Sequence, residues 1–180
     1  MNAIVILGSG FEEIEALAVV DILRRAGMAV QTAGIGGTVI TGSHGIAVHA
    51  DLPIEAAGEP ELLVLPGGLG GVQAMEHSAA AMALIQRQVE SGRPLGAICA
   101  APSILGKRGW ADGRRVTCYP GFEPQMGAAL VQPEAAAVVD GNLVTGRAPG
   151  AAIPFALALV ERFCGAEARR NVAAELVWTD

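Results

Sequence analysis

The sequence has few aromatic residues and few cations, and both shortages limit what the protein can bind. It contains two Trp, one Tyr and four Phe residues, and 12 Lys and Arg residues against 18 Asp and Glu residues give a net charge of −6. Nucleic-acid binding needs a basic surface, and stacking of unpaired bases needs aromatic side chains. The composition therefore argues against a nucleic-acid partner.

The chain also lacks a basic amino-terminal region and any apolar run of the roughly 18 residues that a membrane span requires. No proline-rich or charged linker divides it, and 180 residues with 52% hydrophobic content suffice for one packed core. We therefore expect a single domain over residues 1–180, located in the cytoplasm and without a membrane partner.

Cysteine is scarce as well. The three cysteines form no CxxC pair, which argues against a disulfide scaffold or a zinc knuckle and favours free thiols. The histidines, cysteines and acids lack metal-ligand spacing, and no GxGxxG or Walker pattern follows the first apolar run. We therefore predict no metal and no nucleotide or flavin cofactor.

Continuous apolar runs alternate with amphipathic segments, as expected for strands buried on both faces of a parallel sheet and the helices that cover it. The sequence predicts strands at residues 3–7, 29–33, 61–65 and 95–98, helices at 12–26, 79–90 and 151–164, and hairpins at 38–48 and 138–145. Residues 66–68 are expected to form a turn, with His77 at the start of the next helix. The predicted fold class is α/β with a mostly parallel sheet.

The turn after the strand at residues 95–98 carries Cys99 between small residues, in the sequence AICAA. Small neighbours at these positions are typical of a nucleophile elbow, which leaves the central side chain exposed to substrate. A helix amino terminus after the turn would lower the thiol pKa below about 8.5 and supply oxyanion donors. The turn at Gly67 and Gly68 offers another donor. Alternatively, Cys99 is an inert buried residue.

The other two cysteines are weaker candidates for chemistry. Cys164 ends an apolar helix and is expected in the core, while Cys118 is expected in a strand, where oxidation requires exposure.

A catalytic cysteine usually needs a base, but none of His44, His49 and His77 follows the elbow, and surface positions are the simpler interpretation. Glu12 and Glu13 fit exposed first-turn positions of the helix at 12–26. Glu15 instead shares an apolar stripe with Ala18, Val19 and Ile22. Buried there, Glu15 would stay protonated near neutral pH and donate a hydrogen bond to a thiolate. The alternative is that it only supports the dipole of its own helix.

Together these residues resemble the ThiJ/PfpI superfamily, in its DJ-one branch, over nearly the whole chain. The resemblance rests on GFEEIE at residues 10–15, RRAG at 24–27, VLPGG at 64–68, AICAAP at 97–102, and RAPG at 147–150 leading into FAL at 155–157. It implies a flavodoxin-like three-layer sandwich, similar to class I glutamine amidotransferases, and a homodimer. It also implies a catalytic Cys99 with a protonated Glu15, and a site formed by Gly67, Gly68, Ala100, Tyr119, Arg147 and Pro149.

Members of this branch are credited with glutathione-independent glyoxalase activity on methylglyoxal and with deglycation of glycated molecules. The resemblance thus implies a small aldehyde or glycated substrate, with Cys99 attacking the aldehyde and Glu15 moving a proton between its two carbons. Tyr119 departs from the pattern, because human-branch relatives have a histidine there. A tyrosine can orient a substrate but is a poor base at neutral pH. His44 also stands near where an anion-binding arginine can occur.

Two alternatives remain open. In the first, the protein is a redox-responsive stress or chaperone-like protein whose Cys99 is oxidised to a sulfinate stabilised by Glu15. In the second, it is a peptidase or amidase, which the missing downstream histidine disfavours.

Overall fold

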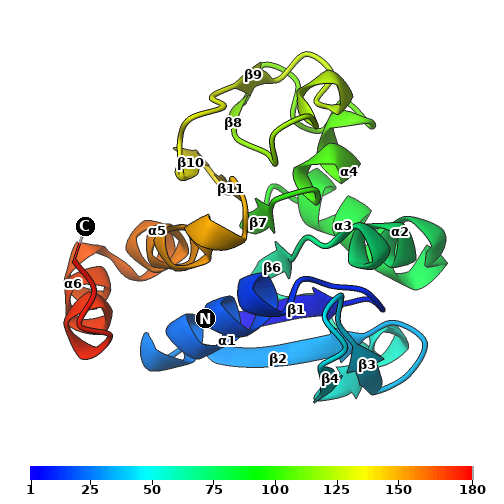
Figure 1. Cartoon of the computed structure of the whole chain (residues 1–180), viewed down its shortest axis with the longest axis horizontal. Coiled ribbons are helices and arrows are strands. Elements are labelled where there is room, and N and C mark those ends of the chain that lie inside the picture. Colours follow the sequence, from blue (N-terminus) through cyan, green and yellow to red (C-terminus); the bar gives the residue numbers. More distant parts are fainter. Residues whose placement is uncertain (180) are drawn as a thin grey trace.

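The computed structural model describes residues 1–179, and its centre is a seven-stranded sheet in the order β10-β11-β7-β6-β1-β2-β5 (Figure 1). The strands are β1 (Asn2–Leu7), β2 (Ala29–Gly34), β5 (Leu52–Pro53), β6 (Leu62–Leu65), β7 (Leu95–Ile98), β10 (Ala137–Asp140) and β11 (Leu143–Gly146). All neighbouring strands pair in parallel except β10 and β11, which form an antiparallel hairpin. The prediction of a mostly parallel α/β sheet is confirmed.

Helices cover both faces of this sheet, as Figure 1 shows. They are α1 (Glu13–Arg25), α2 (Leu69–His77), α3 (Ala79–Glu90), α4 (Pro102–Gly106), α5 (Ala152–Cys164) and α6 (Ala166–Glu175). Helix α1 packs against α5, which packs against α6, and α2 and α3 pack together on the opposite face. Among residues 1–179, no helix has both the length and the apolar character that crossing a membrane requires.

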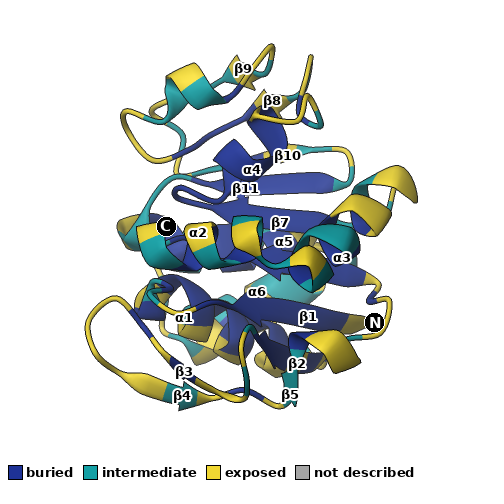
Figure 2. Ribbon diagram, turned by 90° about the vertical axis from the view of Figure 1, so that its right-hand side faces the viewer, coloured by how far each residue is buried: buried dark blue, intermediate teal, exposed yellow. Residues whose placement is uncertain are grey.

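The core lies between these layers, where the central strands are buried along almost their whole length (Figure 2). Every residue of β6, β7 and β11 is buried, which explains why these strands read as continuous apolar runs. Phe11 and Phe155 are the largest fully buried side chains. The carboxyl ends of these buried strands carry the candidate site, so the packing of the core fixes the position of that site.

The predicted helices at 12–26, 79–90 and 151–164 match α1, α3 and α5. The hairpin predicted at 38–48 is a separate antiparallel pair, β3 (Val39–Thr41) with β4 (Ala47–His49).

Two local predictions were wrong. His77 was expected to start a helix but instead ends α2, which begins at Leu69 directly after the predicted turn and was not predicted. Glycines weaken helix propensity at this position, but burial of Val72 and Met75 against the core overrides it. Cys118 was expected in a strand but lies just beyond β8 (Arg115–Val116), which pairs with β9 (Leu130–Val131) in a small separate sheet.

Candidate functional site

Parallel pairing brings the carboxyl ends of β1, β6 and β7 to one edge of the sheet, the usual place for a site in an α/β fold. The loop after β1 leads into α1 and Glu15, the loop after β6 contains Gly67 and Gly68, and the turn after β7 contains Cys99. The Glu12 N–H donates to the Gly67 carbonyl (3.1 Å), which joins the first two loops. The predicted convergence of these three loops is therefore present in the fold.

Cys99 lies on a strained turn between β7 and α4. Its φ of 66° is in the left-handed region, which non-glycine residues rarely adopt and which is frequent at functional sites. Hydrogen bonds fix this backbone on both sides: the Cys99 N–H donates to the Gly146 carbonyl (2.9 Å), and the Tyr119 N–H donates to the Cys99 carbonyl (2.8 Å). The side chain is 7% exposed and lines a pocket, so it is accessible to a small molecule.

The carboxyl group of Glu15 lies beside this thiol and is completely buried. One oxygen, Oε2, accepts a hydrogen bond from the Gly67 N–H (2.7 Å), while the other, Oε1, is buried without a hydrogen-bond partner among the described residues. Burial raises the pKa of Glu15 from 4.5 to about 7, although its interactions with Cys99 and Gly67 act in the opposite direction. Glu15 is thus poised to accept or release a proton near neutral pH.

The thiol itself does not have the lowered pKa that the sequence predicted. Burial and the neighbouring Glu15 carboxylate raise the pKa of Cys99 to about 12, although the N–H groups of Gly68 and Ala100 lower it. Helix α4 has five residues, so its dipole is too small to outweigh the burial. The geometry therefore favours a neutral thiol that transfers its proton to Glu15 as it reacts.

The backbone beside Cys99 is shaped for close approach. The N–H groups of Gly68 and Ala100 lie near enough to the Cys99 sulfur to lower its pKa. Gly68 has a φ of 82°, and a Cβ added there would lie 2.4 Å from the Gly10 carbonyl oxygen. A Cβ added to Gly67 would lie 2.6 Å from both the Cβ of Cys99 and the Oε2 of Glu15. Because Gly67 and Gly68 have no side chains, the Cys99 and Glu15 side chains can lie close together beside the backbone N–H groups.

A pocket of about 250 Å³ opens above Cys99. Its lining residues are Glu12, Gly68, Leu69, Cys99, Ala100, Tyr119, Phe122 and Pro149. Tyr119 and Pro149 are therefore where the resemblance implied. Sequence reasoning missed Leu69 and Phe122, because neither carries a reactive group or a motif spacing.

Arg147 is not among the residues that line this pocket. It lines a neighbouring hollow of about 430 Å³ that shares Tyr119 with the pocket above Cys99. Its guanidinium group pairs with Glu134 (3.3 Å). The implied placement of Arg147 at the Cys99 site is thus corrected to the adjacent surface.

The remaining histidines and cysteines lie outside the pocket lining. His49 is exposed in β4 and His77 is exposed at the end of α2, as expected for surface histidines. Burial and Glu123 raise the pKa of the buried Cys118 to about 11, and Cys164 is half-buried at the end of α5.

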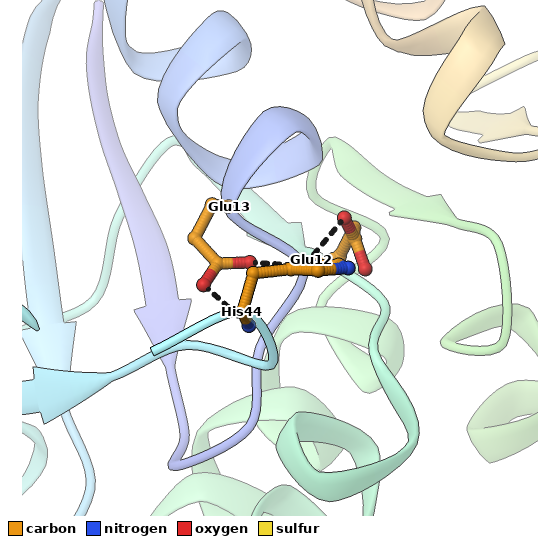
Figure 3. Close-up of side chains that lie close together, drawn as sticks. All are labelled: Glu12, Glu13 and His44. Atoms are coloured by element: carbon orange, nitrogen blue, oxygen red, sulfur yellow. Dashed lines mark hydrogen bonds and ion pairs between the residues drawn. The ribbon is translucent and has the colours of Figure 1, made fainter. Parts of the chain in front are cut away.

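The loop between β3 and β4 is fastened to the start of α1 by Glu12, Glu13 and His44 (Figure 3). The Nδ1 atom of His44 lies 3.0 Å from Oε2 of Glu13 and 3.6 Å from Oε1 of Glu12. Burial opposes ionisation of Glu13, but hydrogen bonds from His44 and Ser43 help to lower its pKa to about 2, and the Glu13 hydrogen bond raises the pKa of His44. Glu13 is buried, contrary to the expected exposed position.

These three residues are also a group that could hold a metal ion, since their ligand atoms lie within 4.8 Å of one another. Linear spacing could not reveal them, because His44 is far from the glutamates in the sequence. The absence of a metal stays a prediction, and the three side chains satisfy one another through the contacts described above.

Replacing Gly67 tests how tightly the pair is packed. We expect Gly67→Ala to push Cys99 and Glu15 apart and to reduce stability by about 1–3 kcal/mol, as is usual for overpacking. Urea denaturation and the rate of Cys99 alkylation measure the two effects. Gly58→Ala is the matched control, because nothing lies within 4 Å of its added Cβ. Wild-type behaviour of Gly67→Ala in both measurements would contradict the described packing.

The raised pKa of Glu15 makes stability depend on pH. The folded state binds the Glu15 proton more tightly than the unfolded state, so the stabilisation is complete below about pH 4.5 and is lost as the pH rises to about 7. The free energy of unfolding should fall by about 3 kcal/mol over this range, because each unit of pKa shift corresponds to about 1.4 kcal/mol. Glu15→Gln should remove this dependence and be more stable than wild type at pH 8, as measured by urea denaturation at several pH values.

The exposed Glu167→Gln variant is the control for this pH experiment, and it should keep the wild-type pH profile. A Glu15→Gln profile that runs parallel to wild type between pH 4.5 and 7 would mean that Glu15 ionises normally.

Comparison with known proteins shows relatives that match nearly the whole chain. The chain is 40% identical to protein dj-1beta of Drosophila melanogaster, over 98% of this chain and 96% of that protein. It is 35% identical to a protein of Pyrococcus abyssi named a deglycase, over 83% and 92%. The structure of oxidized DJ-1 from Toxoplasma gondii superposes with a TM-score of 0.94 at 32% identity, covering 99% of both chains.

The crystal structure of Drosophila DJ-1beta likewise superposes with a TM-score of 0.93 at 38% identity, covering 99% of this chain and 98% of that one. The family model described as DJ-1/PfpI matches residues 1–162. The chain therefore belongs to the DJ-1/PfpI family.

Proposed function

We propose that this protein is a cysteine-dependent enzyme that acts on small reactive aldehydes, in the manner of a glutathione-independent glyoxalase or a deglycase. One observation carries the proposal: a thiol that lines an open pocket lies beside a buried carboxyl group whose pKa is raised to about 7. The relative named a deglycase supports the same class of substrate. The reaction would convert methylglyoxal to lactate.

In the first step the Cys99 sulfur attacks the aldehyde carbon and forms the C–S bond. The thiol proton passes to the Glu15 carboxylate, which explains how a thiol with a raised pKa can react at neutral pH. The N–H groups of Gly68 and Ala100, which lie near the Cys99 sulfur, would stabilise the negative charge that develops on the aldehyde oxygen. Glu15 then protonates that oxygen, which gives a hemithioacetal and returns the carboxylate.

In the second step the Glu15 carboxylate removes the proton from the former aldehyde carbon and returns it to the neighbouring ketone carbon. The hemithioacetal hydroxyl proton moves to the other oxygen, and the product is a thioester of lactate on Cys99. Oxidation of one carbon is balanced by reduction of the other, so no cofactor is required. Water then cleaves the thioester to lactate and restores the thiol. Tyr119 would orient the substrate but has no part in proton transfer.

The test is formation of lactate from methylglyoxal without glutathione. We expect Cys99→Ser and Glu15→Gln each to lose at least about a hundredfold in kcat/KM, because each removes a group that acts in the transition state. The wild-type rate should rise with pH through about 7 as Glu15 ionises.

Cys164→Ser is the matched control for loss of a thiol, because Cys164 lies outside the pocket, and it should keep wild-type activity. Full activity in Glu15→Gln would remove the proposed base, and absence of lactate from wild type would remove the proposed reaction.

A second candidate function is a redox response in which Cys99 is oxidised to a sulfinate. The Gly68 and Ala100 N–H groups and a protonated Glu15 could each hydrogen-bond a sulfinate oxygen. The Toxoplasma relative, whose structure is described as oxidized, favours this candidate.

Mild peroxide treatment followed by intact-mass and peptide analysis tests the redox candidate. We expect Cys99 to gain two oxygens while the buried Cys118 stays reduced, and Glu15→Gln to slow the gain or carry it on to the sulfonate. Equal oxidation of Cys99 and Cys118 would contradict a selective sensor.

A peptidase or amidase is less well supported, because no histidine is among the described residues that line the Cys99 pocket. We also propose that the protein is a homodimer. The exposed Ile14 and Leu17 lie one turn apart on α1 and, with Ile46 of the neighbouring hairpin, offer apolar surface to a second copy. A cytoplasmic location stays a prediction.

A further inference from the structure

The mouth of the Cys99 pocket is apolar, in contrast to its reactive base. Leu69, Tyr119, Phe122 and Pro149 form its walls. The rings of Tyr119 and Phe122 meet edge to face, with centroids 6.3 Å apart and an interplanar angle of 85°. Aromatic walls of this kind bind flat apolar groups by stacking and by edge contacts.

The pocket is also larger than methylglyoxal requires. Its volume is about 250 Å³, far more than the roughly 10–15 Å³ that a cavity needs to hold one water molecule. Methylglyoxal has about five non-hydrogen atoms, and its only apolar substituent is a methyl group. When it is bound, part of the apolar wall therefore stays in contact with water. A larger apolar substituent would fill that space and bury the walls.

Charge at the pocket disfavours anions. Glu12 is the charged residue in the lining, and the buried Glu15 carboxyl lies behind Cys99. No cation is among the described residues that line the pocket: His44 is held against Glu12 and Glu13, as Figure 3 shows, and Arg147 lines the neighbouring hollow, where it pairs with Glu134. The negative substituent of an anionic substrate would therefore be repelled by these carboxylates and would find no cation in the pocket lining to pair with.

We propose that this site prefers α-oxoaldehydes with a neutral aryl or branched alkyl substituent over methylglyoxal and over anionic analogues, with Tyr119 and Phe122 as the residues that set this preference. The inference rests on the proposed aldehyde chemistry and specifies its substrate class. Phenylglyoxal would react as described for methylglyoxal: its aldehyde carbon is oxidised, its ketone carbon is reduced, and water releases mandelate.

The first experiment compares kcat/KM for methylglyoxal, phenylglyoxal and 4-carboxyphenylglyoxal. Wild type should prefer phenylglyoxal to each of the others by at least about tenfold. Phe122→Ala should lower the ratio of phenylglyoxal to methylglyoxal by about tenfold, and Phe122→Leu should restore part of it. Differences in intrinsic electrophilicity cancel when this ratio is compared between variants. Leu130→Ala shortens an exposed apolar side chain outside the pocket and should leave the ratio unchanged.

The second experiment measures binding without turnover, through protection of Cys99 from iodoacetamide by unreactive ketones and acids. Acetophenone should protect at a concentration at least about tenfold below that of acetone and of benzoate, and Phe122→Ala should abolish the difference.

The outcomes separate the two proposals. Turnover of methylglyoxal with an unchanged substrate ratio in Phe122→Ala would overturn the aryl preference and leave the aldehyde chemistry intact. No turnover of any aldehyde, together with selective protection by acetophenone, would overturn the chemistry and support the aryl-selective pocket. Equal protection by acetophenone and acetone would overturn the inference.

Discussion

The left-handed backbone of Cys99 is the constraint on which the site depends. Its φ of 66° turns the thiol away from the packed layers and toward the pocket, and the Gly146 carbonyl and the Tyr119 N–H hold it there. A strained residue of this kind persists only where its surroundings over-determine it. The buried strands β7 and β11 on one side and the segment carrying Tyr119 on the other provide that rigidity.

Glu15 shows how function and stability conflict in this fold. A fully buried carboxyl group is costly when ionised, and this cost is what moves its pKa to about 7. The same burial that makes Glu15 a useful acid and base also raises the pKa of Cys99. The ionisation of the Cys99 thiol and that of the Glu15 carboxyl group are therefore coupled, and neither group should be described by itself.

The chemistry and the substrate preference come from different parts of the pocket. The glycines after β6, together with Cys99 and Glu15, form the reactive base, while the segment containing Tyr119 and Phe122 forms the aromatic wall. Glu12 also lines the pocket, and it is paired with His44 of the loop between β3 and β4 (Figure 3). Substitutions in the aromatic wall can therefore change the substrate preference without disturbing Cys99 and Glu15.

The sequence by itself predicted four parallel strands, the hairpin at 138–145, most of the helices and the convergence of the loops carrying Cys99, Glu15, Gly67 and Gly68, because burial on both faces leaves continuous apolar runs and because parallel strands end at one edge. It gave neither the strand order nor β5. It could not locate α2, where packing of Val72 and Met75 overrides the glycines. Only the tertiary structure decided the thiol pKa, the separation of Arg147 from the pocket, and the meeting of His44 with Glu12 and Glu13. Burial and contacts between distant segments are properties of the packed chain and leave no local pattern in the sequence.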